Sequence, residues 1–260
     1  MKREYKLPRY IIIGAMKAGT TTLYYALTKH SKIRPAHTKE LHYFSNRSYK
    51  SVNATKYKRL FHPCASDEIC GEASPQYLWS PVAPENIKKL LPDVKLIALF
   101  RHPVDRCYSQ FHGYLRKCKK LGQKPITKSF LTFFNKTKNN KNVSGLNYIG
   151  QELVAGSCYV NYLKKWYEHF DKDQIKVIKS EDLFVKPRVV LDEVFDFIGI
   201  EREPVKIKHH VRGKSLNRKV LNQKYPELNP ELRKKLMKYF VKYNQELYEL
   251  IGEDWNWENE

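Results

Sequence analysis

The stretch Tyr10-Ile-Ile-Ile-Gly-Ala-Met-Lys-Ala-Gly-Thr-Thr-Thr22 decides the fold of this 260-residue chain. It opens with a short apolar, β-branched run that meets Gly14, the pattern of a buried parallel strand entering a glycine turn. Leu23, Ala26 and Leu27 follow at helical spacing. The stretch therefore predicts a strand, a loop and a helix in succession, which together present backbone N–H groups and a helix N-terminus to an anion.

Two further units of the same kind follow along the chain. Val94 to Phe100 and Ile175 to Ile178 are short apolar runs that predict buried strands. We expect a helix from Val104 to about Lys117 after the first run, and another from Pro187 after the second. Further amphipathic helices are predicted over residues 84–91, 148–170 and 230–251. Strands that alternate with helices predict an α/β fold with a P-loop-like parallel sheet flanked by helices.

We expect a single domain over residues 1–260, because the sequence shows no internal repeat and no long linker. Residues 117–147 are rich in Lys, Asn, Ser and Thr with few periodic apolar positions, which predicts an exposed insertion. The apolar runs are far shorter than the roughly 20 residues of a membrane-spanning helix. Residues 1–8 also lack the apolar core of a signal peptide. No membrane span is expected in this chain.

Charge is the strongest compositional signal. The chain has 48 Lys and Arg residues against 27 Asp and Glu residues, a net charge of +21. A field of that sign attracts anions such as nucleic acid, an anionic membrane, an acidic polysaccharide or a nucleotide. No helix-turn-helix, RNA-recognition or zinc-finger pattern supports nucleic acid as the partner. Composition alone does not choose among the remaining anions.

The cysteines predict no metal site, because they show neither a C-x-x-C motif nor the Cys/His spacing of zinc ligands. Two alternatives stay open for Cys64 and Cys70, which are six residues apart: a disulfide in an oxidising compartment, or buried free thiols. Four N-x-[ST] glycosylation sequons lie in polar segments that we expect to be surface loops, and they weakly favour a secretory protein. They begin at Asn46, Asn53, Asn135 and Asn142.

The loop after the first strand differs from a nucleoside-triphosphate loop. Gly14 and Gly19 have the glycine spacing of G-x-x-x-x-G-K-[ST], but Thr20 replaces the motif's lysine and Lys17 lies inside the loop. In triphosphate enzymes the motif lysine reaches the terminal phosphates. An ordinary strand-to-helix turn with a surface lysine is the alternative. Against it, the three threonines at residues 20–22 are poor helix formers unless their hydroxyls are used.

Two segments resemble sulfotransferases that use 3′-phosphoadenosine 5′-phosphosulfate (PAPS). Gly14-Ala-Met-Lys-Ala-Gly-Thr-Thr-Thr-Leu23 is similar to the loop that binds the 5′-phosphosulfate in this family. Phe100-Arg-His-Pro-Val-Asp-Arg-Cys-Tyr-Ser109 is similar to the element whose arginine and serine bind the 3′-phosphate. The resemblance runs from about Tyr10 to Trp257. It points toward the Golgi carbohydrate sulfotransferases of the heparan sulfate 3-O-sulfotransferase and N-acetylgalactosamine 4-sulfate 6-O-sulfotransferase types.

The resemblance implies that PAPS is the donor and that no metal is required, because a lysine and backbone donors balance the charge on the leaving oxygen. The implied nucleotide-binding residues are Lys17, Ala18, Gly19, Thr20, Thr21, Thr22, Arg101, Ser109, Arg212, Gly213 and Lys214. The last three belong to a basic loop in the place where the family closes a loop over the nucleotide. A plain solvated loop is the alternative for them.

Lys39-Glu-Leu-His-Tyr-Phe44 resembles the family's K/N-E-x-H-F-F segment, whose glutamate takes the proton of the acceptor hydroxyl. The implied catalytic residues are Glu40 as base, Lys17 as the charge-balancing group and His42 as an orienting or acceptor-contacting group. An effective base needs a pKa near neutrality. Burial would raise the pKa of Glu40 while Lys39 and His42 would lower it, and the sequence leaves that balance open. A surface glutamate in a charged turn is the alternative.

Gly71-Glu-Ala-Ser-Pro-Gln-Tyr-Leu78 resembles the segment that lines the acceptor in this family, with Ala73 where the heparan group has lysine. The implied substrate-binding residues are Glu40, His42, Glu72, Ser74 and Tyr77. The expected activity is transfer of a sulfuryl group from PAPS to a hydroxyl of an acidic glycan, a glycosaminoglycan first among them. The expected location is the Golgi lumen, with the chain as a trimmed catalytic domain.

Three alternatives to this function remain at the level of sequence. A sulfotransferase could act on a small-molecule or phenolic hydroxyl, and such an enzyme could be cytoplasmic. A P-loop nucleotide kinase shares the strand-loop-helix pattern, although Arg101 rather than an aspartate follows the second strand. A non-catalytic polyanion-binding module would account for the net charge of +21 and for nothing else.

Overall fold

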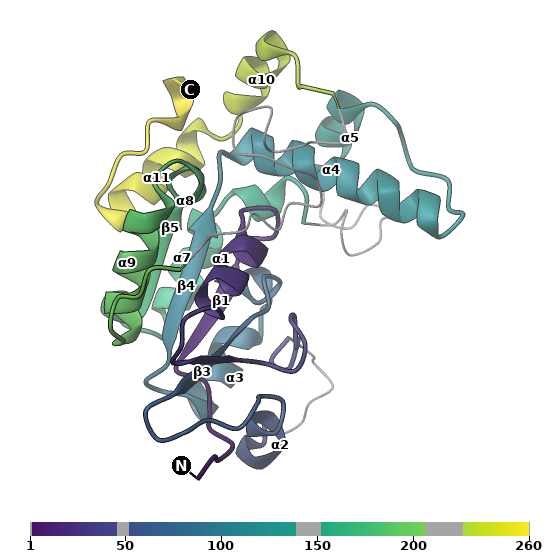
Figure 1. Cartoon of the computed structure of the whole chain (residues 1–260). Helices are drawn as coiled ribbons and strands as arrows, with labels where there is room; N and C mark the ends of the chain where they lie inside the picture. The colour runs from purple at the N-terminus through teal and green to yellow at the C-terminus, as the bar shows by residue number, and fades with distance from the viewer. Residues whose placement is uncertain (1, 46–51, 139–151, 206–225, 260) are drawn as a thin grey trace. The chain divides into compact units, whose positions relative to one another are not determined.

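The computed structural model describes residues 2–45, 52–138, 152–205 and 226–259. The chain forms two compact units. Unit 1 comprises Met1–Phe100 and Leu163–Asn222, and unit 2 comprises Arg101–Tyr162 and Gln223–Glu260. Figure 1 labels their elements along the chain. Both units bury apolar side chains of their own.

Unit 1 is built on a parallel sheet of five strands in the order β2-β3-β1-β4-β5. The strands are β1 (Tyr10–Gly14), β2 (Ile33–Pro35), β3 (Ile69–Ala73), β4 (Lys95–Phe100) and β5 (Ile175–Lys179). Every residue of β1 is buried, because its isoleucines lie in the middle of the sheet with helices on both faces. Tyr10 is in register with Gly71 of β3 and with Lys95 of β4. The predicted α/β fold with a parallel sheet is confirmed.

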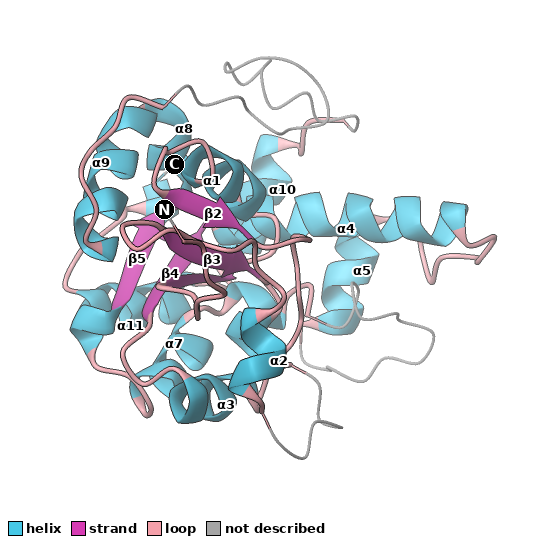
Figure 2. Ribbon diagram, turned by 60° about the horizontal axis from the view of Figure 1, so that its bottom comes forward, coloured by secondary structure: helices cyan, strands magenta, loops and turns pink. Residues whose placement is uncertain are grey.

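Helices cover both faces of this sheet, as Figure 2 shows. The helices α1 (Thr20–Leu27), α8 (Ser180–Val185) and α9 (Pro187–Ile198) lie on one face. On the other face are α3 (Ala83–Leu90) and the part of α7 (Val160–Tyr167) that belongs to unit 1. On α7, the indole N–H of Trp166 donates to the carbonyl of Leu78 at 3.0 Å. A short helix, α2 (Ala54–Lys58), precedes β3 in the chain.

Unit 2 is helical in its described part. Its helices are α4 (Pro103–Lys120), α5 (Phe130–Thr137), α10 (Pro230–Met237) and α11 (Val241–Ile251). On α4 the buried guanidinium of Arg106 donates to Ser157 Oγ and Gln110 Oε1, each at 2.6 Å. Asp105 accepts two hydrogen bonds from Arg233 of α10, at 3.0 and 3.2 Å. These contacts hold α4 as the central helix of the unit.

The structure differs from the sequence-based expectations at several elements. Strands β2 and β3 were not predicted, because neither is an apolar run: β3 reads Ile-Cys-Gly-Glu-Ala. Within residues 117–147, where an exposed insertion was expected, α5 buries Phe130, Phe133 and Phe134. Residues 139–147 lie outside the described part.

Two long predicted helices are shorter in the structure. The helix expected over residues 230–251 is divided into α10 and α11, because the chain turns where Tyr239 and Phe240 contact the ring of Phe134. Of the helix expected over residues 148–170, residues 148–151 lie outside the described part, and the described residues form α7 with a 3₁₀ turn at Ala155–Ser157 before it. The local apolar spacing continues across both breaks, so periodicity alone does not locate them.

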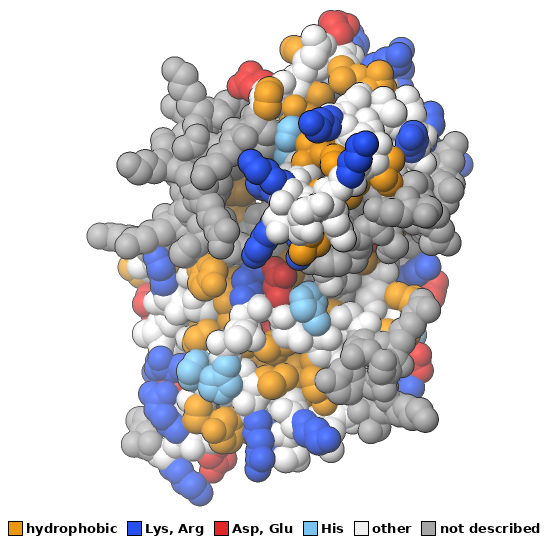
Figure 3. Space-filling model, turned by 90° about the vertical axis from the view of Figure 1, so that its right-hand side faces the viewer, with side chains coloured by type: hydrophobic (Ala, Val, Ile, Leu, Met, Phe, Trp, Pro, Cys, Tyr) orange, Lys and Arg blue, Asp and Glu red, His pale blue; other side chains and the backbone are white. Residues whose placement is uncertain are grey.

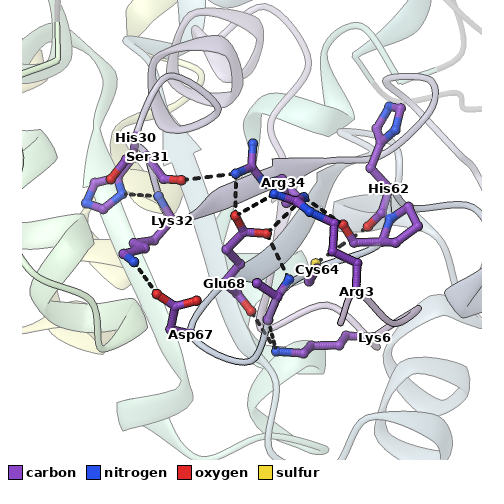
Figure 4. A network of polar contacts seen from close by, with 12 residues as sticks. Arg3, Lys6, His30, Ser31, Lys32, Arg34, His62, Cys64, Asp67 and Glu68 are labelled. Carbon is purple, nitrogen blue, oxygen red and sulfur yellow. Dashed lines mark hydrogen bonds and ion pairs between the residues drawn. The ribbon is translucent and has the colours of Figure 1, made fainter. Parts of the chain in front are cut away.

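A polar network ties the N-terminal segment to the turn before β3 (Figure 4). The carboxylate of Glu68 accepts from Arg34, from Arg3 at 3.3 Å and from the N–H of Ala65 at 2.9 Å. Lys6 Nζ donates to three backbone carbonyls of the same turn, at 2.5 to 3.0 Å. The hydrogen bond from Arg34 is the largest cause that lowers the pKa of Glu68, to about 2. Glu68 is therefore an ionised anchor of the fold.

The five cysteines are buried free thiols in the structure, so the free-thiol alternative describes Cys64 and Cys70 here. Of the four sequons, those at residues 46 and 142 lie outside the described residues. Asn53 caps α2 by accepting from the N–H of Lys56 at 2.9 Å. Asn135 is exposed on α5 and therefore lies on a helix, where a loop was expected.

Candidate functional site

The loop between β1 and α1 is held by hydrogen bonds to other elements of unit 1, near its beginning and near its end. The N–H of Ala15 donates to the carbonyl of Leu99 on β4 at 2.8 Å. The hydroxyl of Ser180, at the start of α8, donates to the carbonyl of Ala18 at 2.7 Å. Between these anchors Lys17 is half-buried and has a φ of 73°, a left-handed conformation that is uncommon for lysine. The loop therefore follows a defined path that includes the predicted lysine.

Both glycines of the loop are required by the backbone. Gly19 has a φ of 91° as the N-cap of α1, a conformation that glycine adopts at little cost. A Cβ on Gly19 would also lie 3.0 Å from Cζ of Phe184. A Cβ on Gly14 would lie 2.6 Å from Cβ of Leu78, closer than real Cβ contacts. This sequence pattern therefore creates a tight backbone loop that a side chain at either position would disturb.

The N-terminus of α1 completes an anion-binding arrangement. The N–H groups of the first helical turn have no intrahelical carbonyl to bind, and the helix dipole adds positive potential there. No acidic side chain lies in this turn and no side chain caps it. Thr20 and Thr22 of this turn are buried and Thr21 is half-buried. Such a loop and helix start fit a phosphate or a sulfate group.

Glu40 lies between two cationic side chains, in a segment that follows β2. Lys39 Nζ donates to its Oε1 at 2.5 Å, and His42 Nε2 lies 3.7 Å from its Oε2. The side chain of Glu40 keeps 42% of its surface exposed, whereas that of Lys39 keeps 11%. Both predicted catalytic residues of this segment therefore meet at one place on the surface of unit 1, beside a lysine.

The balance that the sequence left open falls toward a charged carboxylate. The neighbouring His42 imidazole is the largest cause that lowers the pKa of Glu40, to about 2. Partial burial acts in the opposite direction, and the Lys39 ammonium adds to the lowering. Glu40 is consequently ionised at neutral pH, and a weaker base than a carboxylate whose pKa is raised toward neutrality.

Glu72, Ser74 and Tyr77 are fully buried in unit 1, although the resemblance implied that they contact substrate. The Glu72 carboxylate accepts hydrogen bonds from three hydroxyls: Tyr57 at 2.5 Å, Ser74 at 2.6 Å and Tyr77 at 3.2 Å. Burial is the largest cause that raises the pKa of Glu72, and these hydrogen bonds oppose the rise. The three residues therefore form a closed polar cluster under the surface.

Arg101 and Ser109 belong to unit 2, where Arg101 precedes α4 and Ser109 lies on that helix. Arg101 follows the last residue of β4 directly in the chain, and its carbonyl accepts from the hydroxyl of Tyr159 at 2.7 Å. Arg101 and Ser109 are both half-buried. Arg106 of the same segment is fully buried by contrast, and its hydrogen bonds serve the fold of the unit.

Arg212, Gly213 and Lys214, the predicted basic loop over the nucleotide, lie outside the described residues. Within the described ranges, no group of three or more His, Cys, Asp or Glu side chains could hold a metal ion. No helix in these ranges is long and apolar enough to cross a membrane. The candidate residues that the structure describes are therefore the phosphate-type loop and the Glu40 segment, both within unit 1, and separately Arg101 and Ser109, both within unit 2.

Sequence reasoning missed Tyr57 and Ser180. Tyr57 is fully buried and reaches Glu72 from α2, 15 residues earlier in the chain. Ser180 binds the loop carbonyl of Ala18 across 162 positions of sequence. Such long-range pairs leave no local pattern, so no signal in a single sequence would have found them.

Comparison with known proteins gives a consistent result. The family model described as "Sulfotransferase domain" matches residues 7–252. The chain is 28% identical to the membrane-associated sulfotransferase kil1 of Dictyostelium discoideum, over 97% of this chain and 67% of that protein. It is 28% identical to the human heparan sulfate glucosamine 3-O-sulfotransferase 3B1, over 97% of this chain and 65% of that protein. The chain thus spans about two thirds of the length of these curated relatives.

A solved structure agrees with this match. The crystal structure of a sulfotransferase from Alicyclobacillus acidocaldarius superposes with a TM-score of 0.77 and 25% sequence identity. The similarity covers 97% of this chain and 99% of that one. The likeness therefore extends over the length of a complete solved sulfotransferase chain and is not limited to the phosphate-type loop.

Proposed function

The chain belongs to the sulfotransferase domain family, and on that premise we propose that it transfers a sulfuryl group from PAPS to a hydroxyl of an acidic glycan. The observation that carries this proposal is the pairing, within unit 1, of a phosphate-type loop with an ionised carboxylate. The loop contains Lys17 and opens α1, and the carboxylate is that of Glu40. The first group suits a nucleotide sulfate donor, and the second suits a hydroxyl acceptor.

The residues of the loop fit the 5′ end of the donor. Gly14 and Gly19 let the loop pack against Leu78 and Phe184 without a clashing Cβ, and the uncapped N–H groups at the start of α1 can bind an anion. We assign Lys17 to balance the charge that develops on the leaving phosphate oxygen. Arg101 and Ser109 are assigned to the 3′-phosphate of the nucleotide, as is the basic loop with Arg212, Gly213 and Lys214.

When bound, PAPS supplies an activated sulfuryl group, whose sulfur–oxygen bond to the phosphate breaks as the acceptor oxygen bonds to sulfur. We assign the proton of the acceptor hydroxyl to Glu40. The lowered pKa of Glu40 keeps the carboxylate ready to accept at neutral pH. Because Lys39 and His42 hold that carboxylate in the free protein, the acceptor hydroxyl must replace one of their contacts. The rest of the work is positioning, as in phosphoryl transfer.

An acidic glycan is the acceptor that the charge supports. The net charge of +21 exceeds what one nucleotide site needs, and Figure 3 shows Lys and Arg side chains spread over the described surface of one face, with few acidic ones among them. An extended polyanion gains affinity and association rate from such a field. The human relative with 28% identity is named for its action on heparan sulfate, which is an acidic glycan.

We further propose that the protein works in the lumen of the secretory pathway, where such glycans are made. The exposed sequon asparagine Asn135 supports this location. Expression with a secretory leader should give a species that an N-glycosidase shifts to lower mass, and Asn135→Gln should reduce the shift. An unglycosylated wild-type product would leave a cytoplasmic location as the better proposal.

One experiment tests the activity. The protein is incubated with ³⁵S-labelled PAPS and each of four acceptors: desulfated heparan, chondroitin, a small sugar and a phenol. Label should appear on one of the polyanionic glycans and fall as salt rises, because the surface field is screened. Transfer to the phenol alone would move the acceptor to the small-molecule class. If no acceptor is labelled and the nucleotide does not stabilise the protein against thermal unfolding, the proposal is overturned.

A further inference from the structure

The segment that carries Glu40 has an unusual backbone. Glu40 has a φ of 66° and His42 a φ of 54°, both in the left-handed region that disfavours residues with a Cβ. Such a conformation is strained for a residue with a Cβ and persists only where its surroundings hold it in place. The groups that hold this backbone in place therefore also set the direction of the Glu40 side chain.

Every second N–H group of the segment, at residues 40, 42 and 44, donates a hydrogen bond to the last residue of β3 or to the turn after it. The N–H of Glu40 donates to the carbonyl of Ala73 at 3.1 Å. The N–H of His42 donates to Ser74 Oγ at 3.1 Å, and the N–H of Phe44 donates to the hydroxyl of Tyr77 at 3.3 Å. Two of the three acceptors are side-chain hydroxyls and can rotate.

Glu72 fixes the direction of both hydroxyls. A hydroxyl carries one proton and two lone pairs, so donating the proton to a fixed acceptor leaves the lone pairs in defined directions. Ser74 donates to Oε2 of Glu72 at 2.6 Å, and Tyr77 donates to Oε1 at 3.2 Å. The lone pairs of the two hydroxyls are then available to the N–H groups of His42 and Phe44. The carboxylate is fully buried and touches neither the surface nor Glu40.

We propose that Glu72 is a positioning residue, which holds Glu40 and His42 in their left-handed conformations through Ser74 and Tyr77 and so aims the Glu40 carboxylate. The inference rests on the proposed function, because it assigns a role in the transfer step to a residue that does not touch the substrate. It also replaces direct acceptor contact, which the resemblance implied, as the role of Glu72, Ser74 and Tyr77. Their complete burial supports the replacement.

Tyr57 provides a matched control within the same cluster. Its hydroxyl donates to Oε1 of Glu72 at 2.5 Å, a contact as short as that of Ser74. No described hydrogen bond links the Tyr57 side chain to the backbone of residues 40–44. Tyr57→Phe therefore removes one donor from the carboxylate, as Ser74→Ala does, but leaves the anchors of the segment in place.

The test compares Ser74→Ala, Tyr77→Phe and Tyr57→Phe in the full chain with two measurements. Hydrogen exchange read by mass spectrometry on peptides over residues 38–45 should speed up in the first two variants and stay as in the wild type in Tyr57→Phe. The kcat at saturating PAPS should fall about 10- to 100-fold in the first two, as expected for a misplaced reacting group. The KM for PAPS should hardly change, and kcat of Tyr57→Phe should remain close to the wild type.

The outcomes separate this inference from the proposed function. Faster exchange together with lower kcat in Ser74→Ala and Tyr77→Phe, but not in Tyr57→Phe, supports the positioning role. If kcat is the same in all three variants, or if kcat falls only in proportion to the loss of stability, the positioning role is overturned while the proposed function stands. A wild-type chain that transfers no sulfuryl group overturns the proposed function and the catalytic part of this inference with it. Unchanged exchange in Ser74→Ala overturns the structural part without any activity measurement.

Discussion

Glu40 and Glu72 are two carboxylates of unit 1 with opposite environments. Glu40 is partly exposed between Lys39 and His42, and its pKa is lowered to about 2. Glu72 is fully buried among three hydroxyls, and burial raises its pKa. The Glu40 carboxylate is therefore charged and accessible to solvent, whereas the Glu72 carboxylate contacts only buried protein groups.

Only one of the two carboxylates is placed to exchange a proton with an arriving molecule. Environments that drive the pKa values of neighbouring acidic groups apart assign them different roles. An exposed, ionised carboxylate can accept a proton from an arriving hydroxyl, whereas a buried one without access cannot. In this molecule the buried carboxylate orients hydroxyls, and the hydroxyls in turn hold the segment of the exposed one. Removing each carboxylate should consequently harm different properties.

The largest expected effect is on stability. Glu72→Ala should lower the free energy of unfolding by about 3–5 kcal/mol, because three buried hydroxyls lose their acceptor. Glu40→Ala should change it by less than about 1 kcal/mol, because its two ion pairs are partly exposed. Denaturant unfolding of both variants measures the difference. Equal losses would mean that the two environments are less distinct than the comparison holds.

A second carboxylate with a lowered pKa sharpens the comparison. Glu68 also has a pKa of about 2, but it lies in the network of Arg3 and Arg34 at the turn before β3. Glu68→Gln should cost about 1–3 kcal/mol of stability at pH 7, since a charged hydrogen-bond acceptor is lost. Turnover of the folded variant should equal that of the wild type. A large loss of kcat would mean that Glu68 is also needed for turnover and is not a purely structural carboxylate.

The pH dependence of Glu68 follows from the sign of its shift. Because the folded pKa lies below the ordinary value of 4.5, the stabilisation is complete above that value and is lost as the pH falls toward about 2. The unfolding free energy of Glu68→Gln should thus depend less on pH over this range than that of the wild type. Thermal unfolding of both proteins between pH 5 and pH 3 measures this difference. The same dependence of stability on pH in both would mean that Arg34 does not stabilise the charge of Glu68.

The smallest expected effect concerns the tuning of Glu40 itself. His42→Asn removes the imidazole that contributes most to the lowered pKa, and asparagine tolerates the left-handed backbone at this position. The pKa of Glu40 should rise toward 4.5 but stay below it, because Lys39 remains. Glu40 is then protonated at a higher pH than in the wild type, so the acid limb of the kcat/KM profile shifts to higher pH. Carboxyl NMR titration that finds no rise would assign the lowering to Lys39 instead.

Much of the fold could be predicted because its central strands are apolar runs. Tyr10 to Gly14 and Lys95 to Phe100 are buried throughout or nearly so, and their glycine or proline boundaries are visible in the sequence. Strand β3 was missed since its middle residues are Gly71 and the buried Glu72, which imitate a loop. A buried charge that is satisfied by distant hydroxyls cannot be distinguished locally from a surface charge.

The site divides in the same way. Lys17, the loop glycines and Glu40 were predicted because the motif or the resemblance points to them, and their roles stay a prediction. The structure gives the tight turn at the glycines and the contact of Glu40 with Lys39. The partners of Glu72 could not be foreseen, because Tyr57 reaches it from α2 and the anchors of residues 40–44 come from β3 and the turn after it. Tertiary hydrogen bonds of this kind leave no spacing to read.

If this chain transfers sulfuryl groups with Glu40 as the proton acceptor, Glu40→Gln should lose the transfer step and keep the nucleotide site. Label transfer from ³⁵S-PAPS is followed in a single turnover, with nucleotide binding measured by calorimetry on the same preparation. We predict that Glu40→Gln binds the desulfated nucleotide as the wild type does while its transfer rate falls about 10²- to 10⁴-fold. A variant that binds the nucleotide and transfers the label at the wild-type rate would contradict the account.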